Sequence, residues 1–206
     1  MLMLAGYRRR SRRALGSASV LISTVTIVSA WMLPAAASEP TCFGHAATIV
    51  GHAGDERVEG TPEADVIVGL GGRDIVFGGG GDDLICGNDG SDIVDGGAGS
   101  DRLSGGPGPD FVTGVEGDDV VTGGAGDDVL NFGDAEDGDD AVYGGIGDDD
   151  LHAGVGADLL IGGAGDDRLA EGEVDAPTVD IFGGGSGTDT CSPGSEDVVR
   201  RCELTP

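Results

Sequence analysis

The sequence has no lysine, only three histidines and few aromatic side chains. Its 11 basic residues are all arginines, whereas 38 residues are acidic, and the formal net charge of the 206-residue chain is -27. A chain this acidic repels the phosphates of nucleic acids and anionic lipid surfaces, so we expect neither as a partner. Aromatic residues make up 4% of the chain, while 42 residues are glycine. Composition alone would therefore predict disorder, because there is little bulky surface to bury and much backbone entropy to lose.

Familiar catalytic signatures are also missing. The sequence contains no HExxH, no GxSxG and no GxxxxGK[ST] motif. We interpret His45, His52 and His152 as surface or turn residues rather than as catalytic bases or metal ligands. Paired acids such as Asp82 and Asp83 recur along the chain, which favours a repeated ligand role over a unique catalytic dyad. We expect no enzymatic activity.

The N-terminal segment has the build of a secretory signal peptide, which we place at residues 1–37. An apolar run from Ala14 to Leu33 precedes Pro34 and small residues, with cleavage expected ahead of Ser38. A membrane anchor is the alternative, and SRRAL weakly resembles a twin-arginine export signal. Cleavage would remove five arginines and no acid, so the formal charge would fall by five from -27 to -32. We therefore expect a secreted, extracellular protein that has no membrane association once the signal is removed.

All four cysteines lie in the part predicted to be exported. In an oxidising compartment an even number of cysteines predicts disulfides, here two. Four cysteines allow three pairings, and their positions near the two ends favour Cys42 with Cys86 and Cys191 with Cys202. Thiolate metal binding is the weaker alternative, since the chain has no CxxC pair.

A nine-residue period overturns the expectation of disorder. Rows such as GGGGDDLIC, GNDGSDIVD and GGAGSDRLS follow one another without slippage from Gly51 to Asn131. After three extra residues the period resumes from Ala135 to Ala170, and two degenerate rows follow a second insertion, Glu171 to Val174. The eighth position is the predicted core: Val58, Ile67, Val76, Ile85, Val94, Leu103, Val112, Val121, Leu130, Val142, Leu151, Leu160, Leu169, Phe182 and Cys191.

These rows resemble the RTX-type nonapeptide repeat GGxGxDxUx, the haemolysin-type calcium-binding family, over roughly residues 51 to 191. The resemblance implies an all-β fold, a parallel β-roll whose alternate rows stack on the same side with several Ca²⁺ ions between successive turns. Independently, glycines at the first, second and fourth positions suit a backbone of positive φ with inward carbonyls. A three-residue strand around the eighth position would point that side chain inward and its neighbours outward.

Oxygen-rich turns of this kind suit Ca²⁺, a hard cation that takes six to eight oxygen ligands, better than Zn²⁺. The candidate carboxylate ligands occupy the sixth position: Asp65, Asp74, Asp83, Asp92, Asp101, Asp110, Asp119, Asp128, Asp140, Asp149, Asp158 and Asp167. The candidate turn glycines occupy the first and fourth positions: Gly78, Gly81, Gly87, Gly90, Gly96, Gly99, Gly105, Gly108, Gly114, Gly117, Gly123, Gly126, Gly144, Gly147, Gly162 and Gly165.

Some rows depart from the pattern. Glu63 replaces a fourth-position glycine, and Ala135, Ala153 and Asp175 replace first-position glycines, so sites beside them are less certain. We expect weak or absent sites at Glu56 and in the row DAPTVDIFG. Open solenoid ends need covering, which predicts an N-terminal cap at residues 38–50, with Ile49 continuing the inward aliphatic row, and a disulfide-closed C-terminal cap at residues 192–206. The β-roll takes residues 51–191.

Calcium should decide whether this chain folds. One inward aliphatic side chain per row is a thin core against the backbone entropy of ordering every row, and stacked aspartates repel one another. We expect a disordered metal-free chain that folds when several Ca²⁺ ions bind. The leading hypothesis is therefore a secreted, non-enzymatic calcium-binding protein. The alternatives are an adhesin or matrix protein that uses the rigidified roll as a scaffold, and an accessory module of a separately encoded secreted enzyme.

One outward stripe goes beyond the repeat pattern. Rows of one parity place Ile75, Ile93, Phe111 and Val129 at the seventh position, in line on one sheet face. Ordinary β-propensity accounts for such residues, and docking of a cell-surface, matrix or secreted protein, or self-association, is the alternative.

Overall fold

The computed structural model describes residues 39–132, 138–152, 154–170, 179–194 and 197–204. The predicted signal peptide lies outside the described residues. Among the residues described, no helix is long and apolar enough to cross a membrane.

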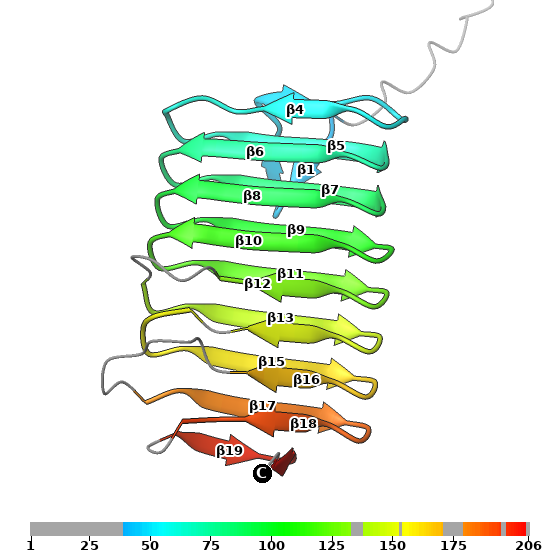
Figure 1. Cartoon of the computed structure of the whole chain (residues 1–206). Coiled ribbons are helices and arrows are strands. Elements are labelled where there is room, and N and C mark those ends of the chain that lie inside the picture. Colours follow the sequence, from blue (N-terminus) through cyan, green and yellow to red (C-terminus); the bar gives the residue numbers. More distant parts are fainter. Residues whose placement is uncertain (1–38, 133–137, 153, 171–178, 195–196, 205–206) are drawn as a thin grey trace, which may run out of the picture. The chain divides into compact units, whose positions relative to one another are not determined.

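The described chain forms a parallel β-solenoid of two facing nine-stranded sheets, as Figure 1 shows, which confirms the predicted β-roll. Successive strands alternate between the sheets, so each strand pairs with the strand two further along the chain. The odd-numbered sheet contains β3 (Ile49–Val50), β5 (Val66–Gly72), β7 (Leu84–Gly90), β9 (Arg102–Pro107), β11 (Val120–Ala125), β13 (Ala141–Ile146), β15 (Leu159–Ala164), β17 (Ile181–Ser186) and β19 (Val198–Arg200). The even-numbered sheet contains β4 (Arg57–Glu59), β6 (Ile75–Gly80), β8 (Ile93–Ala98), β10 (Phe111–Glu116), β12 (Val129–Asn131), β14 (Asp150–His152), β16 (Arg168–Ala170), β18 (Thr190–Ser192) and β20 (Glu203–Leu204).

The core is one column of side chains between the sheets. Every predicted eighth-position residue is buried there, from Val58 to Cys191, and Ile49 continues the column at its N-terminal end. Phe132 is an addition that the period does not predict, because it belongs to the first insertion yet has no exposed surface. The insertion therefore supplies one more core residue without shifting the register of β12 on β14.

Many strands are longer than the predicted three residues. They continue past the ninth position into the glycines of the next row, for example β8 from Ile93 to Ala98. The expectation that first-position glycines adopt positive φ is also wrong: positive φ falls at the second and fourth positions, as at Gly97 (104°) and Gly99 (136°). The first-position glycine is extended, and it is required for space instead.

Both end segments contribute to the sheets. Beyond β3, the N-terminal segment forms a hairpin of β1 (Thr41–Cys42) and β2 (His45–Ala46), which lies against β5 and β7. The Cys42–Cys86 disulfide, with Cα atoms 5.7 Å apart, ties this hairpin to the outward ninth position of β7. Figure 1 shows β1 running along the back of the roll. Thus the hairpin covers part of an outer sheet face.

The C-terminal segment closes with the second predicted disulfide, Cys191–Cys202. Between its cysteines lies β19, and β20 follows, so the tail adds one further strand to each sheet. The sheets therefore extend beyond the repeat boundaries drawn from the sequence, at both ends.

Candidate calcium sites

Each sixth-position aspartate joins its own row to the row two before it. Asp83 Oδ1 accepts a hydrogen bond of 2.7 Å from the backbone N–H of Asp65, and Asp101 Oδ1 accepts one of the same length from Asp83 N–H. The same bond recurs along both edges of the roll and spans the insertions, where the separation grows to 21 or 22 residues. These carboxylates are buried although they lie in turns, because the next turn stacks on them.

The second carboxylate oxygen is the chemically informative atom. In eight rows Oδ2 is buried and has no hydrogen-bond donor from the described protein. An ionised carboxylate oxygen without a donor carries a large desolvation penalty, so a buried row of them calls for positive charge. The eight residues are Asp74, Asp83, Asp92, Asp101, Asp110, Asp128, Asp149 and Asp167.

Backbone carbonyls border the same space. A Cβ atom on Gly87 would lie 2.5 Å from Asp92 Oδ2 and 2.7 Å from the carbonyl oxygen of Gly105, two rows ahead. First-position glycines are therefore required because a methyl group would fill the space that the carboxylate and carbonyl oxygens surround. Fourth-position carbonyls also point toward the next stacked turn, as Gly81 O does toward Gly99. Carboxylate and carbonyl oxygens that face one another without donors are the ligand set that Ca²⁺ takes.

Burial raises the pKa of all eight of these carboxyl groups above the ordinary value. The pKa rises to about 6 at Asp101, Asp110 and Asp149 and to about 7 at Asp128. The chief cause is desolvation, opposed by the backbone hydrogen bond to Oδ1 and reinforced by neighbouring carboxylates. Without a cation the turns thus disfavour ionised carboxylates, and a bound cation would reverse that preference.

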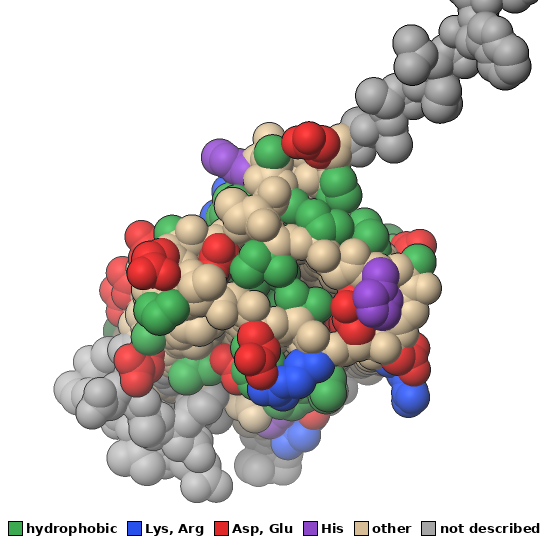
Figure 2. Space-filling view, turned by 90° about the horizontal axis from the view of Figure 1, so that it is seen from above, with side chains coloured by type: hydrophobic (Ala, Val, Ile, Leu, Met, Phe, Trp, Pro, Cys, Tyr) green, Lys and Arg blue, Asp and Glu red, His purple; other side chains and the backbone are tan. Residues whose placement is uncertain are grey.

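A second, exposed series of carboxylates occupies the fifth position. Its bonds run the opposite way: Asp82 Oδ1 accepts from Ser100 N–H, 18 residues later, and Asp148 Oδ1 accepts from Asp166 N–H. Figure 2 looks along the roll from its N-terminal end and shows acidic side chains gathered at the two sides, where the turns lie. The two series make both edges strongly negative.

The N-terminal rows are built differently. Asp65 Oδ2 accepts bonds of 2.8 Å from both the N–H and the hydroxyl of Thr61, and its Oδ1 accepts a 3.1 Å bond from the Thr48 hydroxyl. Both oxygens of this predicted ligand are thus bonded to protein donors. Glu56 similarly accepts from the backbone N–H of His52, and its Oε2 lies 3.1 Å from Nε2 of the same residue's imidazole.

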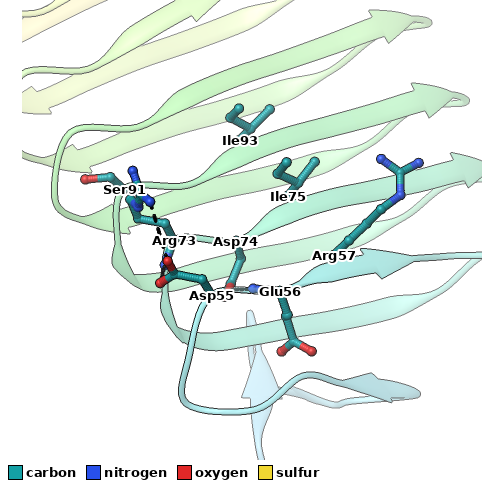
Figure 3. A pocket seen from close by; sticks show the side chains of 8 residues that line it. All are labelled: Asp55, Glu56, Arg57, Arg73, Asp74, Ile75, Ser91 and Ile93. Atoms are coloured by element: carbon teal, nitrogen blue, oxygen red, sulfur yellow. Dashed lines mark hydrogen bonds and ion pairs between the residues drawn. The ribbon is translucent and has the colours of Figure 1, made fainter.

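On the edge that carries Glu56 and Asp74, Arg73 replaces a fifth-position acid. Its guanidinium lies 3.5 Å from Asp55 and its N–H donates to Asp55, as Figure 3 shows beside the bond from Glu56 N–H to Asp74. An arginine here partly neutralises the edge without a metal ion.

The C-terminal end closes in a way that the sequence analysis missed. Asp197 takes the sixth-position role: Oδ1 accepts from Asp180 N–H at 3.1 Å, and Oδ2 accepts from Gly194 N–H. The signal was present in the sequence, because Asp197 stands two residues before Val199, as every sixth-position acid stands before its core residue. At Asp180, in the row expected to be weak, the buried carboxylate still accepts a 2.9 Å bond from Asp158 N–H.

The predicted ligands therefore come together as two edge series, and in the eight rows with a donor-free Oδ2 the carboxylate lies beside the row's first-position glycine. Among the described residues no group of three or more His, Cys, Asp or Glu side chains gathers around one point, so backbone carbonyls would have to complete each cation site. The donor-free oxygens of the eight aspartates named above and the side-chain-free space at their glycines fit a hard cation and do not fit Zn²⁺, which prefers nitrogen and sulfur.

Comparison with known proteins agrees with this geometry. No curated protein matches the chain. A family model, RTX calcium-binding nonapeptide repeat, matches in four copies at residues 50–85, 78–112, 104–137 and 134–169. Together these copies cover more than half of the chain and carry the two edge series. The chain belongs to the RTX calcium-binding nonapeptide repeat family.

Proposed function

We propose that this protein is a secreted, non-enzymatic calcium-binding protein whose β-roll forms when several Ca²⁺ ions bind between stacked turns. The observation that carries the proposal is the row of buried Oδ2 atoms without donors, each beside a glycine that leaves room for a cation. When bound, Ca²⁺ would supply the positive charge that these oxygens lack. Binding free energy would then act as folding free energy.

The ligands of these sites are the sixth-position carboxylates together with first- and fourth-position carbonyls. We place the cation-dependent rows at the eight aspartates, from Asp74 to Asp167, whose Oδ2 has no protein donor. Asp65 and Asp197 would stay metal-free, because protein donors already occupy both of their oxygens. We expect affinities of about 0.1 to 1 mM, typical of extracellular calcium modules.

Secretion is supported by the two disulfides and by the composition of residues 1–37. Cysteines that are paired in the folded protein fit an oxidising compartment. External calcium would then meet the chain only after export. The non-enzymatic role is supported by repetition, since the paired acids recur from turn to turn and no row stands out as a single reaction centre.

Far-ultraviolet circular dichroism of residues 38–206, disulfides intact, tests the proposal. We expect little β signal in chelator, a cooperative gain on titration with Ca²⁺ and little response to Mg²⁺, whose octahedral preference these carbonyl-rich turns do not meet. A spectrum already β-rich in chelator, or unchanged by Ca²⁺, would rule out calcium-driven folding. Secretion needs a separate measurement: the N-terminal residue of the protein recovered from the culture medium should be Ser38.

A further inference from the structure

The outer face of the odd-numbered sheet is free of acidic residues over six consecutive paired strands. None of β9, β11, β13, β15, β17 and β19 contains Asp or Glu, and their two charged residues are Arg102 and Arg200. By contrast, strands of the even-numbered sheet contain Glu59, Asp95, Glu116 and Asp150. We call this surface the acid-free face. It is exceptional in a chain with 38 acidic residues.

The acid-free face is also apolar. Val120, Tyr143, Ile181 and Val198 expose 37%, 37%, 42% and 40% of their surface, and Ile146 exposes 66%. The seventh position forms one apolar row from Val120 through Ala141 and Leu159 to Ile181 and Val198. Tyr143 lies beside Ile161, and Ile146 lies between Ala125 and Ala164. A contiguous apolar surface of this kind marks an interaction site more reliably than scattered residues do.

The N-terminal part of the same sheet shows how the chain treats such a surface. There the hairpin covers the outward side chains: Val68 is 2% exposed and Cys42 is fully buried. Phe43 in the hairpin turn reaches Arg102, whose guanidinium lies 4.6 Å from the ring centroid. The covered surface ends at this contact, and the acid-free face begins beside it.

We propose that a second copy of the chain covers the acid-free face through a two-fold axis that runs parallel to the strands, between β13 and β15. Such an axis reverses the stacking order and leaves each strand position facing its equivalent. Large residues then meet small ones or one another in the centre: Ala141 faces Leu159, Tyr143 faces Ile161 and Ile146 faces Ala164. The surface is thus complementary to itself in size.

The area is sufficient for a dimer. Five strands of six residues and the three-residue β19, at about 4.8 Å spacing and about 3.3 Å rise, give a footprint of roughly 520 Å² per copy. Two copies would bury about 1,000 Å², the size at which a specific but weak interface becomes possible. We therefore expect a reversible dimer. The dimer rests on the proposed function in one respect, because the acid-free face exists only after calcium has folded the roll.

Charge at the borders favours the same axis. At the edge before these strands, the exposed acids Asp118 and Asp139 would face Val179 and Ala157 of the second copy. A two-fold axis along the roll would instead set the two acidic edges against each other. At the far edge Asp148 meets Asp166, where bound calcium would offset the repulsion.

Sedimentation velocity of residues 38–206 in saturating Ca²⁺, over a wide range of protein concentrations, tests the proposal. We expect a monomer–dimer equilibrium that Tyr143→Asp combined with Ile161→Asp weakens by more than about tenfold. The matched control is Ile93→Asp combined with Phe111→Asp on the even-numbered sheet, which should leave dimerisation unchanged. Circular dichroism with Ca²⁺ must first show that both variants fold like the wild type, which separates loss of the interface from loss of the roll.

Cross-linking then tests the register. A mixture of Ala141→Cys and Leu159→Cys proteins should form a disulfide-linked dimer, whereas Ala141→Cys alone should not. A calcium-folded wild type that stays monomeric at every concentration overturns the proposal. A dimer that survives Tyr143→Asp with Ile161→Asp but is lost in the Ile93→Asp, Phe111→Asp control also overturns it. The interface would then be the stripe of Ile75, Ile93, Phe111 and Val129 on the even-numbered sheet.

Discussion

Replacing Asp101 with asparagine should have opposite effects on the metal-free and the calcium-bound protein. The asparagine side chain can still accept the bond from Asp83 N–H through its oxygen, so the link between rows is kept. Its amide group would take the place of the buried Oδ2 and would face the space that the carbonyl of Gly114 also borders. The change removes a negative charge and adds a donor, with almost no change in size.

The magnitude follows from the pKa. Burial raises the pKa of Asp101 from 3.8 to about 6, so the metal-free roll loses roughly 3 kcal/mol at neutral pH by holding this carboxylate ionised. Burial of an imperfectly hydrogen-bonded amide costs the variant about 1 kcal/mol, which offsets part of the gain from removing the charge. We therefore expect Asp101→Asn to stabilise the metal-free roll by about 2 kcal/mol. Calcium binding should weaken, because one anionic ligand is lost.

The assay is circular dichroism of wild type and variant in chelator with increasing sulfate, and then with increasing Ca²⁺. The variant should gain β structure at lower sulfate and need more Ca²⁺ than the wild type. Asp82→Asn is the matched control, since Asp82 is the adjacent exposed acid and its bond to Ser100 N–H is preserved. A variant that is less structured than wild type in chelator would refute the electrostatic argument, and an unchanged calcium midpoint would refute the ligand role.

Three further predictions concern single positions and pH. Gly87→Ala should raise the Ca²⁺ concentration at which half of the protein is folded, since its methyl group meets Asp92 Oδ2 and Gly105 O. If about four ions bind together, a penalty of about 2 kcal/mol raises this concentration roughly twofold. Gly80→Ala, whose Cβ meets Pro62 O at 3.6 Å, should change little in the same titration. Val115 has φ of 90°, which β-branched residues rarely adopt. Val115→Gly should therefore stabilise the calcium-bound protein by about 1 kcal/mol and raise its melting temperature, and a lower melting temperature would contradict this. Because the folded pKa values are raised, protonated carboxyls favour the metal-free roll: β structure in chelator should increase as pH falls from about 7 toward 4, while calcium affinity measured by calorimetry decreases over the same range.

The period predicts most of the fold because the same interaction is repeated in every row. An aspartate two residues before an aliphatic side chain fixes which residues point inward, and the inward column from Val58 to Cys191 follows from that alone. The outer hairpin was beyond such reasoning, since nothing periodic says that residues 41–46 cover the outer positions of β5 and β7. Strand length was also underestimated, because positions 1 to 3 of the next row continue the sheet despite their glycines.

The candidate site was predicted in its chemistry and less well in its limits. The sixth-position carboxylates and the need for glycine both follow from the pattern, yet whether an oxygen has a donor depends on individual neighbours. Asp65 stands at the sixth position as the pattern requires, although Glu63 breaks the pattern in its row, and only the structure reveals that Thr48 and Thr61 bond both of its oxygens. Asp197 breaks the nine-residue count, and its role appears only when β19 is seen to pair with β17.

The direction of the sixth-position bonds has a consequence for how the chain is made. Each of these aspartate N–H groups finds its acceptor on the carboxylate of the row two later, as Asp74 does on Asp92. Synthesis proceeds from the N-terminus, so no row can complete this bond until at least seventeen more residues have been added. A growing chain is therefore always incomplete at its newest two rows, and the last sixth-position bond that the described chain shows, from Asp180 to Asp197, becomes available only once Asp197 in the tail has been added.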